Sequence, residues 1–177
     1  MRKLLITLTV LGLISAFALA FVYQWTMPKI LQHQEVGKKD AILTVLPESE
    51  QYQEVRKGEL TFYEGNKNGE VAMVASGGGF QGQIEVMIGF NPTAGKVYSI
   101  KVLNHQETPG LGAYITGEKF ERNFVDKPFG EYKVVKRPVK SAHEVEAIAG
   151  ATITSEKVAE IVEKAIKEIR EVYGGEI

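Results

Sequence analysis

The hydrophobic residues of the chain form one unbroken apolar run, several alternating stretches and one helical stripe. The run covers residues 4–23 and contains no charged side chain. About twenty helical residues at ~1.5 Å each span ~30 Å, which is the thickness of the hydrocarbon core of a membrane. Arg2 and Lys3 precede the run, and Tyr23 and Trp25 follow it where an interfacial aromatic belt would lie. This pattern predicts a transmembrane anchor whose N-terminus is cytoplasmic.

A cleaved signal peptide is the competing interpretation, because Ala18-Leu19-Ala20 resembles a cleavage site. The apolar run is longer than the usual signal-peptide core of about 7–15 residues, which favours an uncleaved anchor. Both interpretations send the rest of the chain across the membrane. We expect an anchor with its flank at residues 1–27, a helical connector at 28–50 with one or two short helices ending at Pro47, and a globular domain at 51–177.

The globular part alternates apolar and polar residues in short stretches separated by turn residues, which is typical of strands. Residues 58–65 and 69–76 are expected to pair as a hairpin, and further strands are expected at 83–90, 96–103 and 132–137. Residues 110–125 are expected to be partly helical. Because strands and helices mix without strict alternation, the predicted fold class is α+β, with one mixed sheet-and-helix domain.

The helical stripe lies near the C-terminus, beginning near Ser155. Its apolar residues recur at spacings of three and four, and lysines and glutamates fill the other face. Thr154 is expected to be the N-cap, with Ile153 and Val158 forming a hydrophobic staple across it.

Composition argues against several classes of function. The 177 residues carry a formal net charge of −1, which argues against a nucleic-acid-binding protein. The absence of cysteine excludes disulfides, thiolate nucleophiles and cysteine-ligated metal centres. The three histidines are far apart in sequence, so no pair has the spacing of a metal site on a helix.

Three hydroxyl residues, Thr152, Thr154 and Ser155, stand at the start of the helix, behind Ala149-Gly150-Ala151. One hydroxyl is enough for a helix cap. A helix N-terminus beside a glycine is also a favourable place for a phosphate group. The stretch is not a nucleotide-binding P-loop, because it lacks the glycine-lysine pair. If Thr154 caps the helix, the hydroxyl of Thr152 is left available for another role.

The same stretch resembles the flavin-attachment motif of FMN-binding domains, in which the threonine of Gly-Ala-Thr carries FMN through a phosphoester bond. The resemblance assigns covalent FMN to Thr152, beside Gly150 and Ala151, with Thr154 close to the cofactor. The acidic and small positions of the motif fall on Glu146 and Ala149, where Asp and Ser or Thr are commoner.

A second stretch, residues 104–115, looks like the His-x-Glu-Thr-Pro-Gly-Leu-Gly signature of this family. Taken alone it also fits an ordinary Pro-Gly turn. The resemblance implies that the turn packs against the flavin ring through Glu107, Thr108, Gly110, Leu111 and Gly112. A third stretch, residues 77–90, resembles a further family element.

The anchor, the length and the three motifs together resemble the G subunits of Rnf-type ion-translocating ferredoxin:NAD⁺ oxidoreductases. The related C subunit of sodium-pumping NADH:quinone oxidoreductases, NqrC, ranks second because it is usually longer. The resemblance implies an electron carrier without independent turnover, FMN as cofactor, other membrane subunits of the complex as partners, and a flavin transferase that installs FMN from FAD. It places the protein in the inner (cytoplasmic) membrane with its FMN domain on the outer side. A flavin module serving another oxidoreductase and an anchored structural protein without flavin remain alternatives.

Overall fold

The computed structural model describes residues 2–67 and 69–174. The first element is one long helix, α1 (Arg2–Val45), which continues through Pro28. The chain divides into two compact units, Met1–Lys38 and Lys39–Ile177. The N-terminal unit contains the apolar run, and α1 is the one helix of the described residues that is long and apolar enough to cross a membrane.

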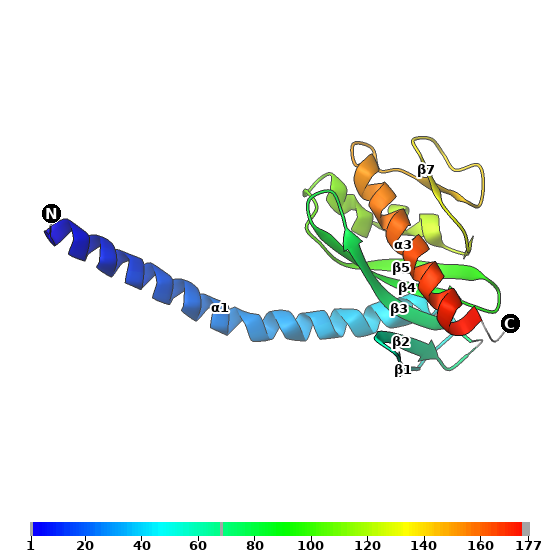
Figure 1. Cartoon of the computed structure of the whole chain (residues 1–177), viewed down its shortest axis with the longest axis horizontal. Helices are drawn as coiled ribbons and strands as arrows, with labels where there is room; N and C mark the ends of the chain where they lie inside the picture. The colour runs from blue at the N-terminus through cyan, green and yellow to red at the C-terminus, as the bar shows by residue number, and fades with distance from the viewer. Residues whose placement is uncertain (1, 68, 175–177) are drawn as a thin grey trace. The chain divides into compact units, whose positions relative to one another are not determined.

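The second unit is built on a six-stranded antiparallel sheet whose strands follow one another in chain order (Figure 1). The strands are β1 (Tyr52–Lys57), β2 (Leu60–Gly65), β3 (Val71–Gly78), β4 (Gln83–Asn91), β5 (Lys96–His105) and β6 (Lys127–Pro128). The central pairs β3–β4 and β4–β5 are long. Val71 of β3 lies opposite Phe90 of β4, and Ile84 of β4 lies opposite His105 of β5.

Neighbouring side chains on these strands point to opposite faces of the sheet, so the sheet carries two apolar layers. Phe62, Met73 and Ile88 belong to the larger core, which packs against the C-terminal helix α3 (Thr152–Tyr173). The residues next to them along the strands, Tyr63, Ala72 and Met87, belong to a second core that contains the last turn of α1. The sheet is therefore covered on one face by α3 and on the other by residues 41–46.

Short elements join the sheet to α3. Strand β5 is followed by the 3₁₀ turn η1 (Gly112–Thr116), the short helix α2 (Glu118–Glu121) and the 3₁₀ turn η2 (Arg122–Phe124). The strands β7 (Lys133–Val135) and β8 (Glu144–Glu146) then form a separate parallel pair. Residues 147–151 lead from β8 into α3, whose start lies close to η1 (Figure 1).

The predicted α+β class is confirmed, and the expected hairpin is the observed pair β2–β3. The helical connector differs from expectation, because a single helix reaches Val45 where one or two short helices were expected. The C-terminal helix begins at Thr152, three residues before the expected start. The domain limits at 27/28 and 50/51 stay predictions.

The second core gives a test of the fold. Ile42 is 1% exposed in this core, whereas its neighbour Leu43 is 41% exposed on the same helix. Ile42→Ala should lower the free energy of unfolding of the detergent-solubilised protein by about 2–5 kcal/mol, because it leaves a cavity against the sheet. Leu43→Ala is the matched control and should cost less than about 1 kcal/mol. Equal losses in denaturant unfolding would contradict this packing.

Candidate functional site

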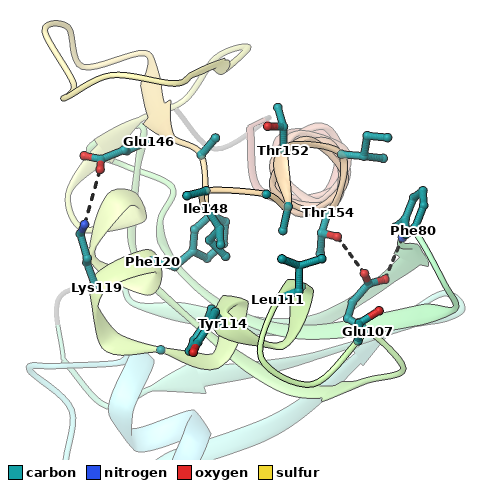
Figure 2. A pocket seen from close by; sticks show the side chains of 18 of the residues that line it. Phe80, Glu107, Leu111, Tyr114, Lys119, Phe120, Glu146, Ile148, Thr152 and Thr154 are labelled. Atoms are coloured by element: carbon teal, nitrogen blue, oxygen red, sulfur yellow. Dashed lines mark hydrogen bonds and ion pairs between the residues drawn. The ribbon is translucent and has the colours of Figure 1, made fainter.

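A pocket of about 940 Å³ opens at the N-terminal end of α3 (Figure 2). Its walls come from the turn between β3 and β4, the loop after β5, η1, α2, η2, the residue after β7, and the segment from β8 into α3. Its lining residues are Phe80, Glu107, Thr108, Leu111, Gly112, Tyr114, Gly117, Lys119, Phe120, Asn123, Lys136 and 146–154. The three sequence motifs, which lie far apart in the chain, therefore meet at one site.

The three hydroxyl groups at the start of α3 have different environments. The N-cap is Ala151, which makes no side-chain cap, so the prediction that Thr154 caps the helix is wrong. Thr154 is 2% exposed, and its hydroxyl donates a 2.8 Å hydrogen bond to Glu107. The fully buried Ser155 hydroxyl donates to the carbonyl oxygen of Ala151 and accepts from the N–H of Ile148.

Thr152 differs from both neighbours. It is half-buried, it lines the pocket, and its hydroxyl makes no hydrogen bond to any residue in the described part of the chain. Figure 2 shows its side chain on the side of the helix opposite the bond between Thr154 and Glu107. Thr152 is also the first helical residue, so the backbone N–H groups of the first turn lie next to its hydroxyl.

Glu107 is the most buried charged residue of the pocket wall, at 4% exposure. Its Oε1 accepts hydrogen bonds from the N–H groups of Phe80 at 2.7 Å and Gln81 at 3.1 Å. Its Oε2 accepts from Thr154. Burial raises the pKa of the Glu107 carboxyl, but the bonds from Thr154 and the backbone lower it, and the net result is a pKa below its ordinary value of 4.5.

Two backbone hydrogen bonds stabilise the turn after Glu107. The carbonyl oxygen of Thr108 accepts both, from the N–H groups of Leu111 and Ala113. Gly110 has φ +76°, which favours glycine, but a Cβ there would point into open space and Gly110 does not line the pocket. A Cβ on Gly112 would lie 2.7 Å from Glu107 Oε2 and 3.1 Å from Thr154 Oγ1. The glycine at 112 is therefore required by the contact between Glu107 and Thr154.

The attachment motif packs directly on this turn. Gly150 has φ +79°, and a Cβ there would lie 2.9 Å from Leu111 Cδ1. Leu111 and Gly150 both line the pocket, as does the buried Ala151. Two of the sequence motifs are thus in contact through residues that sequence reasoning had assigned separately to the cofactor.

Sequence reasoning missed most of the apolar wall. Its members are Phe80, Tyr114, Phe120, Ile148 and Ile153. Phe80, Tyr114 and Ile153 are among the few large hydrophobic residues that the second unit exposes. In the sequence they look like ordinary strand, turn and helix residues, so only their exposure in the fold marks them.

Two lysines and a second carboxylate complete the charged lining. Lys119 forms an ion pair with Glu146 at 3.6 Å, and Lys136 is the residue after β7 (Figure 2 shows the ion pair). Among the described residues, no group of three or more His, Cys, Asp or Glu is placed to hold a metal ion.

The pocket fits a flavin nucleotide. Its volume lies in the usual range of about 300–1,000 Å³ for ligand sites, and exposed aromatic and aliphatic side chains supply an apolar wall for a flat ring. Free N–H groups and the positive end of the α3 dipole lie beside Thr152, and the first turn of α3 holds no acidic residue that would repel a phosphate.

The sequence model of the FMN-binding domain matches residues 79–167, which include the whole pocket. The chain belongs to the FMN-binding domain family. It is 32% identical over 171 residues to the G subunit of the proton-translocating ferredoxin:NAD(+) oxidoreductase complex of Clostridium ljungdahlii, covering 95% of this chain and 91% of that protein. It is 29% identical to the G subunit of an ion-translocating oxidoreductase complex of Methanosarcina acetivorans, covering 93% and 92%.

Solved structures of related proteins share the fold. NqrC of Shewanella oneidensis superposes with a TM-score of 0.57 at 21% identity, covering 66% of this chain and 64% of that chain. The C subunit of the Na(+)-translocating NADH-quinone reductase of Parabacteroides distasonis gives 0.54 at 27% identity, covering 62% and 60%. The predicted family and its FMN cofactor are confirmed, and the relatives are subunits of redox complexes.

The Glu107 network predicts a specific response to acid. Above the ordinary carboxyl pKa the ionised Glu107 stabilises the fold fully, and this stabilisation is lost as the pH falls through its lower folded-state pKa. Glu107→Gln should therefore reduce the free energy of unfolding at pH 7 by about 1.5–3 kcal/mol, and the difference from wild type should shrink toward pH 3.

Glu146→Gln is the matched control, because its ion-pair partner Lys119 is almost fully exposed. It should change stability by less than about 1 kcal/mol at both pH values. A Glu107→Gln effect that is constant with pH in denaturant titrations would show that the carboxylate charge is not what stabilises the network.

Proposed function

We propose that this protein is the membrane-anchored, FMN-carrying electron-transfer subunit of an ion-translocating ferredoxin:NAD⁺ oxidoreductase complex, and that Thr152 carries the FMN through a phosphoester bond. The assignment of the covalent bond to Thr152 rests on how the three hydroxyl groups at the start of α3 differ in burial and hydrogen bonding. Thr154 and Ser155 are buried and hydrogen-bonded, whereas Thr152 lines the pocket with a hydroxyl that bonds to no described residue.

FMN supplies one- and two-electron transfer when it is bound, and the protein determines where it is held and how exposed it is. Thr152 tethers the phosphate, and the N–H groups of the first turn of α3 bind its remaining charge. The helix dipole contributes about 0.3–1 kcal/mol to that interaction. Leu111, Phe120 and Ile148 offer apolar surface to the ring.

The chain spans about nine-tenths of the G subunits from Clostridium and Methanosarcina but less than two-thirds of the two NqrC chains. This supports a G-type subunit over an NqrC-like one. Its partners are then the other membrane subunits of the complex and a flavin transferase that attaches FMN from FAD. The chain alone has no turnover of its own, because electrons must reach and leave the flavin through partners.

The N-terminus is cytoplasmic in this proposal, and the FMN domain lies on the outer side of the cytoplasmic membrane. The apolar part of α1 and the basic residues before it support this orientation. A covalent tether suits that location, because it prevents the cofactor from diffusing away.

Replacing the acceptor hydroxyl tests the covalent assignment. Thr152→Val keeps the side-chain shape and removes the hydroxyl, so flavin fluorescence in a denaturing gel should vanish while the protein stays folded. Thr154→Val should instead lose the bond to Glu107, lower the free energy of unfolding by about 1.5–3 kcal/mol, and keep the fluorescence. If Thr154→Val alone abolished the fluorescence, the attachment site would be two residues further along the chain.

The natural absence of cysteine makes the orientation testable with single cysteines. Lys133 is exposed in the FMN domain, so Lys133→Cys should react with a membrane-impermeant maleimide on cells whose outer layers are opened. A cysteine inserted after Met1 should react only after the cytoplasmic membrane is permeabilised. Labelling in the reverse pattern would contradict the orientation, and an N-terminus beginning at Phe21 would show cleavage of the anchor.

A further inference from the structure

Two carboxylates line the pocket, and their surroundings differ. Glu146 is half-buried and faces Lys119 at 3.6 Å, so a cation balances its charge. Glu107 is 4% exposed, and its hydrogen-bond donors are two backbone N–H groups and one hydroxyl, all of them neutral. Within the described chain, no lysine, arginine or histidine forms an ion pair with Glu107.

Neutral donors stabilise a carboxylate without cancelling its charge. Their dipoles offset the cost of removing the charge from water, which is why Glu107 stays ionised in spite of its burial. The full negative charge remains in the pocket wall, where little water screens it. A Coulomb interaction that is weak in water grows several-fold in such surroundings.

We propose that Glu107 tunes the redox potential of the cofactor: its uncompensated carboxylate, fixed in the pocket wall by Phe80, Gln81 and Thr154, makes the bound flavin harder to reduce. The inference rests on the proposed function, because it needs the flavin in this pocket. A fixed negative charge disfavours the arrival of an electron nearby. Glu107 also acts as a positioning residue, since it holds the start of α3 through Thr154.

The other charged and titratable groups near Glu107 leave its charge unbalanced. His105 uses its Nδ1 to accept the backbone N–H of Glu107 and does not contact the carboxylate. On α2 and the β7–β8 segment, the charged lining residues are Lys119, which pairs with Glu146, and Lys136. The first turn of α3 brings only Thr154 to the carboxylate.

The direct test is the flavin midpoint potential of the full-length protein, measured by spectroelectrochemistry at pH 8. Glu107→Gln keeps the side-chain shape and removes the charge, so the potential should shift to a more positive value. Glu146→Gln removes a charge that Lys119 and water already screen, so its shift should be smaller and should fall with added salt. An unchanged potential in Glu107→Gln, or a shift no larger than in Glu146→Gln, would overturn the proposal.

A second variant separates charge from structural disturbance. Thr154→Val removes one donor but leaves the carboxylate, so its potential at pH 8 should equal the wild-type value or lie below it. Because the lost bond lets Glu107 protonate at a higher pH, its potential should rise above wild type as the pH falls toward 4.5. A positive shift already at pH 8, or no difference at any pH, would contradict the role of the charge even if Glu107→Gln failed to fold.

These measurements remain separate from the covalent assignment. The potential reports on whatever flavin the pocket holds, whether tethered or not. In-gel fluorescence that persists in Thr152→Val, together with the expected potential shift in Glu107→Gln, would refute the tether on Thr152 and leave the tuning role of Glu107 intact. A tethered flavin whose midpoint potential is unchanged in Glu107→Gln would refute the tuning role and leave the tether on Thr152 intact.

Discussion

The pocket depends on one buried carboxylate. Glu107 accepts hydrogen bonds from Phe80 and Gln81 in the turn between β3 and β4, and from Thr154 at the start of α3, 47 residues further along the chain. Two glycines are required around it: a Cβ on Gly79 or Gly112 would collide with the Glu107 side chain. The β3–β4 turn, the turn after β5 and the start of α3 are thereby held in one arrangement, and the pocket is the space that this arrangement leaves open.

The parts of the fold that depend on local periodicity were predictable from the sequence. Short apolar-rich stretches bounded by turn residues along residues 60–90 indicated the strands. The stripe from Val158 to Ile169 indicated α3, because its residues face one sheet. The uninterrupted apolar run indicated the anchor by length alone. The attachment motif and the Pro-Gly turn, which lie far apart in the chain, both line one pocket.

Other features depend on contacts between distant residues, and there local reasoning failed. Thr154 looks like a helix cap in the sequence, but its hydroxyl donates a hydrogen bond to the carboxylate of Glu107 on another segment. The helix itself begins at Thr152, two residues before Thr154. The resemblance implied that both glycines of the turn lie against the flavin ring. Gly112 lines the pocket and also leaves room for Glu107, whereas Gly110 has a positive φ and does not line the pocket. Nothing in the sequence near Phe80 or Tyr114 shows that the fold leaves them exposed beside α3.

The proposed attachment site follows from which hydroxyl groups at the start of α3 are buried and hydrogen-bonded, and which one lines the pocket. Burial and hydrogen bonding occupy Thr154 and Ser155, so Thr152 is the hydroxyl left at the mouth of the pocket. The most direct measurement is peptide mapping by mass spectrometry of the protein purified from its native membrane. Cleavage after Lys140 and Lys157 yields a peptide that contains all three hydroxyl residues. Fragmentation should place a phosphoflavin group on Thr152. The same group on Thr154 or Ser155, or an unmodified peptide from a yellow protein, would contradict this assignment.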